Sequence, residues 1–203
     1  MIHEAGTAAL RAGTTVQGVL EVCADLCQRV PVVVMCYANL VLVRGPEVFA
    51  ASLRDAGASG LIVPDLPLEE APRVLEACDA VGVALVPLVA PTTPDERLAQ
   101  IGARARGFLY TVAVVGTTGE RAELAPDVAE VIARAHAHTD VPVALGFGIS
   151  TPQHAAAAAA AGADGVIVAS RLVRAAAEAA ADGSDPAGTV RDLVASLAAG
   201  LQL

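Results

Sequence analysis

The stretch that decides the fold is VPVALGFGISTP, residues 141–152. Its first part is continuously apolar, as in a strand buried on both faces of a parallel sheet. A short glycine loop follows directly. Thr151 and Pro152 then favour a helix start, because threonine can cap a helix and proline suits its first turn. Strand, glycine loop and helix in this order form the repeating unit of a parallel β/α fold.

The same unit recurs on both sides of this stretch. Strict alternation of strands and helices predicts a parallel sheet with right-handed crossovers. Six apolar runs predict strands at about residues 30–37, 60–63, 83–89, 107–112, 141–145 and 165–168. Helices are expected at about 3–12, 15–29, 46–56, 68–80, from 93 onward, 126–136, 151–162, 171–181 and 188–201.

The expected number of strands is too small for a closed barrel. A (β/α)8 barrel needs eight strands and usually about 250 residues, whereas this chain has 203 residues. We therefore expect one α/β domain over residues 1–203, an incomplete TIM barrel with about six parallel strands. Because the chain opens on a helical pattern, the deficit is expected at its amino-terminal end. Open strand edges then predict poor solubility or oligomers for the chain expressed alone.

Composition excludes several classes of protein. The net charge is −9 and the sequence contains no lysine, which argues against nucleic acid as the main ligand. Any phosphate must then be held mainly by backbone amides and hydroxyls. We expect a cytoplasmic protein, because no apolar run reaches about 18 residues and no secretory signal opens the chain. Cys23 and Cys27 share a helical face, but no second ligand pair completes a metal site, so no metal is predicted.

Three segments have the form of phosphate-binding loops: residues 114–119, 146–150 and 165–170. Each of the last two follows an apolar run and leads into a helix. Any one glycine loop could serve only a tight turn. The three loops occur together with Ser170, which starts a helix after the last strand. This combination predicts a phosphate site, because backbone N–H groups and helix N-termini bind anions there.

Other polar residues fall at strand ends, where barrels bind their ligands. Asp65 ends the strand near residues 60–63, where it is either a ligand-facing carboxylate or one that enters a turn or helix. Tyr37 and Tyr110 can each place a hydroxyl beside a ligand, although tyrosine in a strand also serves core packing.

These segments resemble the tryptophan synthase alpha subunit family. The matching motifs are MCYANLV at 35–41, LIVPDLP at 61–67, APTT at 90–93, GTTG at 116–119 and GFGIS at 146–150, in the family's order. The similarity covers nearly the whole chain. It implies a (β/α)8 barrel that cleaves indole-3-glycerol phosphate to indole and glyceraldehyde 3-phosphate. It also implies no cofactor in this chain and a partner, the pyridoxal-phosphate-dependent beta subunit of an α2β2 complex, which receives the indole.

By position, the resemblance assigns the substrate phosphate to Gly119, Gly148, Ala169 and Ser170. Ala169 departs from the family, which usually has glycine there. A methyl group could crowd the phosphate, and it would cost on the order of 1 kcal/mol if the position required positive φ. With an ordinary φ the alanine is harmless.

The resemblance and the strand-end positions together predict the remaining pocket. Its expected members are Tyr37, Asp65, Phe147 and Ile149. Tyr110 and Thr118 are expected to support catalysis by lining the site, and Thr118 is the family residue that helps to order the mobile loop over bound substrate.

The family's reactive carboxylates are a glutamate from the second strand and an aspartate from the following loop, and both lie upstream of the segment that aligns with Met1. We therefore expect the 203-residue form to be inactive. One hypothesis is that Met1 is a misassigned start and that the product extends about 50–60 residues upstream, from the missing barrel units. The alternative is a noncatalytic, phosphate-binding alpha-like module that modulates a beta-type partner. A phosphoribosyl isomerase is a third possibility, which the 35–41 and 61–67 motifs argue against.

Overall fold

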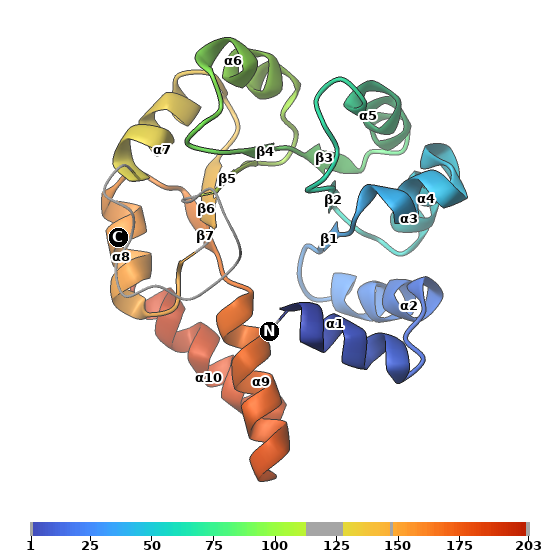
Figure 1. The fold of residues 1–203 in the computed structure, drawn as a ribbon, viewed down its shortest axis with the longest axis vertical. Helices are drawn as coiled ribbons and strands as arrows, with labels where there is room; N and C mark the ends of the chain where they lie inside the picture. Colours follow the sequence, from blue (N-terminus) through green and yellow to red (C-terminus); the bar gives the residue numbers. More distant parts are fainter. Residues whose placement is uncertain (1, 113–127, 147, 202–203) are drawn as a thin grey trace.

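The strands form an open arc, with the helices along its outer side (Figure 1). The structure, a computed structural model, describes residues 2–112, 128–146 and 148–201. All strand pairs are parallel, in the orders β1-β2-β3 and β4-β5-β6-β7. The strands are β1 Val33–Met35, β2 Gly60–Ile62, β3 Ala84–Val86, β4 Leu88–Val89, β5 Leu109–Val112, β6 Val143–Gly146 and β7 Gly165–Ile167. The predicted incomplete α/β barrel of parallel strands is confirmed.

One expected strand, residues 83–89, is divided in two at Pro87. Residues on the amino-terminal side pair with β2, and those on the carboxyl-terminal side pair with β5. Proline has no N–H to donate to a ladder. Its carbonyl still accepts a hydrogen bond from the Tyr110 N–H at 3.0 Å. Six apolar runs therefore give seven strands in the described part of the chain.

The helices follow the predicted order, with one addition. They are α1 Ile2–Arg11, α2 Val16–Cys27, α3 Ala38–Arg44, α4 Pro46–Asp55, α5 Ala71–Asp79, α6 Asp95–Arg104, α7 Val128–His136, α8 Pro152–Ala160, α9 Ser170–Asp182 and α10 Pro186–Ala199. The addition is α3, which occupies an apolar stretch without a local helix cap. In the described part of the chain, no helix has the length and apolar character needed to cross a membrane.

Helix starts are predicted at Thr151 and at Thr93, and only the first is confirmed. Thr151 caps α8 as expected, because its side chain accepts from the His154 N–H. The helix expected to start at Thr93 begins instead at Asp95. The Thr93 hydroxyl accepts from the Ala90 N–H at 2.9 Å, so it closes the preceding turn and is not available as a cap.

The core is divided between the two halves of the arc. One apolar cluster contains Leu53 and Leu61 and packs α2, α4 and α5 against β2 and β3. A second contains Leu109 and Leu145 and packs α6 to α8 and α10 against β4 to β6. A small third cluster contains Ile62, Val86 and Tyr110, from β2, β3 and β5, and thus joins the two halves.

The two ends of the arc are unpaired in the part of the chain that the structure describes. β1 is hydrogen-bonded only to β2, and β7 only to β6. β2 and β6 are fully buried, whereas every residue of β7 is half-buried and Met35 of β1 is 51% exposed. Outside this gap, α1 contacts α9 (Figure 1). The ring of strands is thus open between β1 and β7.

Candidate functional site

The predicted site residues follow the carboxyl ends of several strands. Tyr37 follows β1, Asp65 follows β2, Gly148 follows β6 and Ser170 follows β7, while Tyr110 lies in β5. Because the strands are parallel, their carboxyl ends lie on one side of the arc, where barrels of this kind bind ligands.

Asp65 caps a helix that is distant in sequence. Its Oδ1 accepts a hydrogen bond of 2.8 Å from the N–H of Ala38, the first residue of α3. Tyr37, which precedes that helix, makes no side-chain cap, and its own side chain is 66% exposed. Of the roles expected for Asp65, the structure shows helix entry. Its carboxylate caps α3, which comes earlier in the chain, and not the helix that follows Asp65. It ties the loop after β2 to the helix after β1.

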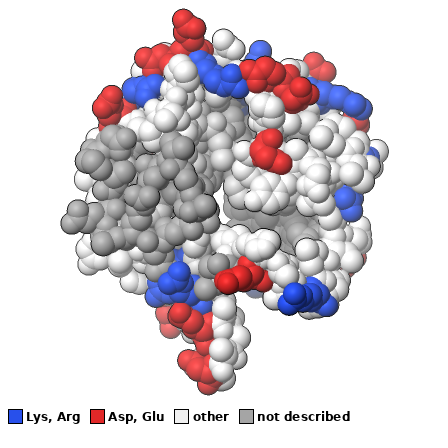
Figure 2. Space-filling model, in the orientation of Figure 1, with Lys and Arg blue, Asp and Glu red and all other residues white. Residues whose placement is uncertain are grey.

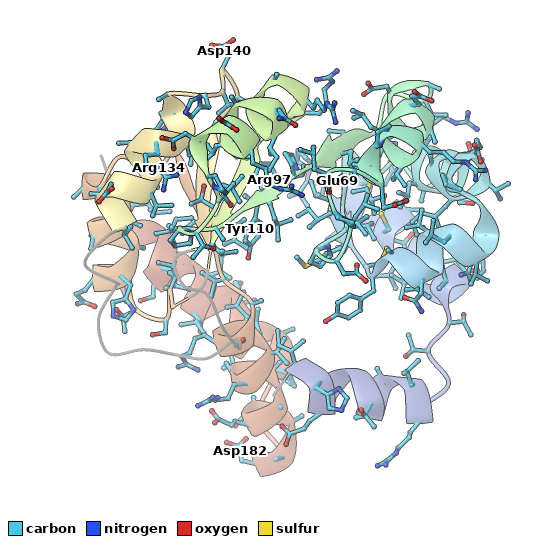
Figure 3. The ribbon with its side chains drawn as sticks, turned by 45° about the horizontal axis from the view of Figure 1, so that its top comes forward. Glu69, Arg97, Tyr110, Arg134, Asp140 and Asp182 are labelled. Atoms are coloured by element: carbon cyan, nitrogen blue, oxygen red, sulfur yellow. The ribbon has the colours of Figure 1, made fainter. Side chains whose placement is uncertain are left out.

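Tyr110 lies on the inner side of the arc, at 6% exposure, against Ile62 and Val86 (Figure 3). Burial raises the pKa of its hydroxyl. A tyrosine hydroxyl is already protonated at neutral pH, and the raised pKa leaves it so, as a group able to donate a hydrogen bond.

Gly146 provides the space for Tyr110. A Cβ added to Gly146 would lie 2.6 Å from Cζ of the tyrosine ring, closer than side-chain atoms pack. The sequence pattern includes Gly146 only as the first residue of a glycine loop. A glycine inside a strand is a known indication of close approach by another group, and this position is an example.

The loop after β6 is anchored from within the core. Gly148 has a φ of +83°, and among the described residues beyond its chain neighbours no atom lies within 4 Å of the position that a Cβ would take. Ile149 is buried in the apolar cluster of the second half, so its predicted contact with a ligand stays a prediction. His154 Nδ1 accepts from the Ser150 N–H at 3.3 Å. The glycine is thus followed by residues that the core and His154 hold in place.

Ala169 and Ser170 mark the start of α9. Ala169 precedes the helix with φ −126° and ψ −67° and makes no side-chain cap. Because this φ is negative, the cost considered for an alanine at positive φ does not arise. Ser170 opens a helix of 13 residues, whose first N–H groups point out of the helix end and favour an anion.

Three predicted site residues, Thr118, Gly119 and Phe147, lie outside the described residues. Among the described residues, no group of three or more His, Cys, Asp or Glu side chains is placed to hold a metal ion. Cys23 and Cys27 lie with their sulfur atoms 3.7 Å apart.

An apolar cavity of about 210 Å³ lies elsewhere, between α5 and α6. Leu66, Leu75 and Ile101 contribute to its walls, and Arg97 lies at it. Arg97 faces Glu69 (Figure 3) and donates two hydrogen bonds to its carboxylate, at 2.7 and 2.9 Å. Tyr110, Gly148 and Ser170 do not line this cavity. The described residues predicted to bind the phosphate therefore lie outside this cavity.

Parallel strands that alternate with helices around an open arc define a β/α-barrel chain. The sequence profile described as "Tryptophan synthase alpha chain" matches residues 1–200. The chain belongs to this family.

Individual relatives agree with the profile. The tryptophan synthase alpha chain of Trichodesmium erythraeum is 42% identical over 184 residues, which is 90% of this chain and 69% of the relative. The structure of Mycobacterium tuberculosis tryptophan synthase matches with a TM-score of 0.90 and 38% identity, covering 100% of this chain and 75% of that one. The tryptophan synthase α2β2 complex of Pyrococcus furiosus matches with a TM-score of 0.88 and 32% identity, covering 98% and 79%. This chain spans about two thirds of the length of the curated relatives it matches.

Proposed function

We propose that this chain carries the phosphate-binding part of a tryptophan synthase alpha subunit, a lyase that cleaves indole-3-glycerol phosphate to indole and glyceraldehyde 3-phosphate. The family match over residues 1–200 carries the proposal. The Gly148 loop and the start of α9 support it, because they follow neighbouring strands β6 and β7 at the predicted phosphate position.

Several of the described residues contribute to substrate binding in this proposal. The N–H groups at the start of α9 and the Ser170 hydroxyl hold the phosphate, with the Gly148 backbone beside them. The Tyr110 hydroxyl, which is protonated at neutral pH, donates to substrate from the inner side of the arc. This assignment suits a chain with net charge −9 and no lysine, in which backbone and hydroxyl groups must replace cationic side chains.

Cleavage of the substrate requires groups that transfer protons, in addition to groups that bind the phosphate. The bond between indole C3 and the glycerol chain breaks as the ring carbon gains a proton and a glycerol hydroxyl loses one, which calls for a positioned acid/base group. By the resemblance, a glutamate transfers these protons and an aspartate accepts from the indole N–H, and both precede the part aligned with Met1. We therefore propose that the 203-residue form binds the phosphate moiety and does not by itself release indole.

A beta subunit is the proposed partner. The Pyrococcus furiosus relative is described as an α2β2 complex, and the loops after β1 and β2 lie on the same side of the arc as the phosphate residues. In this proposal the partner, and not this chain, holds pyridoxal phosphate.

Calorimetry with glycerol 3-phosphate tests the phosphate site directly. Ser170→Ala should weaken binding about tenfold, as expected for a lost hydrogen bond to a charged group. Ser184→Ala, in the exposed turn after α9, is the matched control and should change affinity less than twofold. Equal effects of the two variants would contradict the site. An assay for indole should show no release by this chain, and release would refute the proposed inactivity.

By the resemblance, the reactive carboxylates precede the part aligned with Met1, whereas the proposed phosphate-binding residues follow it. This separation also favours a second candidate function. In it, the chain binds phosphorylated ligands without cleaving them and modulates a beta-type partner. Turnover by a beta subunit, measured with and without this chain, distinguishes the two. A change that depends on glycerol 3-phosphate supports modulation, whereas a glutamate-bearing strand encoded in frame ahead of Met1 supports the lyase.

A further inference from the structure

The cavity of about 210 Å³ between α5 and α6 lies where the two halves of the arc meet. β3 pairs within one sheet and β4 within the other, and Pro87, which separates these strands, lies in the cavity wall. α5 packs against α4 of one half, and α6 packs against α7 of the other half. The two helices therefore stand on opposite sides of the division between β3 and β4 (Figure 1), and the cavity lies between two separately packed units.

The walls of this cavity are mainly apolar and come from both halves. Ala71 and Leu75 of α5 are four residues apart, so they lie on one helix face. Ile101 of α6 lines the cavity from the other half, and Leu85 and Leu88 line it from the strands. A ligand held here would contact both halves of the molecule.

The charged residues of the lining have one sign. Of the described residues that line the cavity, only Arg97 and Arg104 carry a charge. Their spacing from Ile101 puts them on the same face of α6. By contrast, arginine and acidic side chains are interspersed along the edge of the molecule over α5 and α6 (Figure 2). The cavity lining is thus cationic, whereas the surface around it is mixed.

The two arginines differ in how far their charge is compensated. Arg97 is paired with Glu69 through two hydrogen bonds, which leaves other N–H groups of its guanidinium able to donate. Arg104 is exposed and has no ion-pair partner among the described residues. An anionic group at the solvent side of the cavity would therefore find an uncompensated guanidinium, and carboxylates are bound well by such a group.

The size of the cavity limits the rest of the ligand. An apolar protein cavity of about 150 Å³ binds benzene, so 210 Å³ suits a somewhat larger apolar body of two fused rings. A flexible aliphatic chain of similar volume would lose more conformational freedom on binding. Size and charge together favour a rigid aromatic body with one carboxylate.

We propose that the cavity between α5 and α6 binds a two-ring aromatic carboxylate, with the rings between Leu75 and Ile101 and the carboxylate at Arg104. Because such a ligand bridges the two halves, its binding stabilises the folded chain. The proposal goes beyond the reaction proposed above and does not depend on it, since none of the described residues proposed to bind the phosphate lines this cavity.

Titration with 2-naphthoate tests the charged end of the site. Its fluorescence is readily followed because the sequence contains no tryptophan. Arg104→Gln should weaken binding of 2-naphthoate about tenfold, as expected for a lost hydrogen bond between charged groups. The same variant should change the affinity for the uncharged 2-naphthalenemethanol less than twofold. Arg73→Gln is the matched control, because Arg73 belongs to α5 but is not among the described lining residues, and it should bind 2-naphthoate as the unsubstituted chain does.

A second pair of variants tests the apolar end. Ala71→Phe places a ring in the cavity and should weaken binding of both naphthalene compounds at least tenfold. Ala80→Phe, at the exposed C-cap of the same helix, should change either affinity less than twofold. Circular dichroism checks that each variant folds.

Several outcomes would overturn the proposal. The unsubstituted chain might show no saturable binding, or Ala71→Phe might bind 2-naphthoate as tightly as the unsubstituted chain, which would leave only a surface anion site. Tighter binding of octanoate than of 2-naphthoate would assign the cavity to aliphatic acids. Displacement of 2-naphthoate by glycerol 3-phosphate would place the probe in the phosphate site. Failure of the phosphate site itself is measured separately, by the glycerol 3-phosphate calorimetry described above.

Discussion

At the scale of single residues, the contact between Gly146 and Tyr110 leads to a strong prediction. In Gly146→Ala, the new methyl group would overlap the Tyr110 ring, whose Cζ lies 2.6 Å from the Cβ position. The ring must move within a packed interior, and we expect a loss of about 1–3 kcal/mol in the free energy of unfolding. Gly165→Ala in the neighbouring strand is the control, because no atom of the described residues beyond its chain neighbours lies within 4 Å of its Cβ position. Urea unfolding measures both, and equal losses would refute this role of Gly146.

For Ala169, in contrast to Gly146, we predict only a small effect of exchanging alanine and glycine. Its φ of −126° is one that alanine adopts without strain. Ala169→Gly, which restores the residue usual in the family, should therefore bring no gain in stability and a loss of up to about 1 kcal/mol, because glycine gives the unfolded chain more freedom. Affinity for glycerol 3-phosphate should change less than twofold. A stabilised variant in thermal unfolding would show that the position prefers glycine.

At the scale of elements, Arg134 of α7 fastens the loop after β4. It donates to the carbonyl oxygens of Pro91 and Thr93, at 3.1 and 2.6 Å, and to the carboxylate of Asp95. Its side chain is 29% exposed. We expect Arg134→Met to cost about 2 kcal/mol, because two partly buried carbonyl groups lose their donor. Asp95→Asn should cost at most about 1 kcal/mol, since only an exposed ion pair is weakened. Chemical denaturation compares the two, and a larger loss for Asp95→Asn would contradict this account.

Glu69 and Arg97 connect the turn before α5 to α6. The hydrogen bonds from Arg97 lower the pKa of the Glu69 carboxyl below its ordinary value of 4.5. A carboxyl with a lowered pKa in the folded state stabilises the fold above pH 4.5, and this contribution is lost as the pH falls through the folded-state value. Glu69→Gln should therefore lower the melting temperature at pH 7, and the difference should shrink as the pH falls through the folded-state pKa of Glu69. The same pH profile in Glu70→Gln would indicate a general charge effect instead.

Elements show where sequence reasoning succeeds and where it ends. The strands of 60–63, 107–112 and 141–145 are predicted well, because glycine or proline bounds each apolar run on at least one side. Helix α3 is missed because its cap comes from Asp65, 27 positions along the chain. The division of the third strand at Pro87 depends on which neighbour each part meets, and no local pattern carries that information. Likewise, Gly146 is predicted as a loop residue, but its contact with Tyr110 follows from pairing of β5 with β6.

At the scale of the whole molecule, the two apolar clusters predict that the two halves of the arc open partly independently of each other. Leu53 of α4 and Leu145 of β6 are both fully buried, in different clusters. In the described part of the chain, the joining cluster, α1 against α9, and the ion pairs Glu69–Arg97 and Asp79–Arg106 link the halves. Exposed ion pairs contribute little. The link between the halves is therefore weaker than either core.

Hydrogen exchange on matched variants tests this division. Each of Leu53→Ala and Leu145→Ala should cost about 3–5 kcal/mol by leaving a cavity in its own cluster. We expect Leu53→Ala to speed amide exchange in β1 to β3 and α2 to α5 more than in β6, and Leu145→Ala to do the reverse, because partly separate cores open separately. Uniform acceleration along the chain in both variants would show a single cooperative unit.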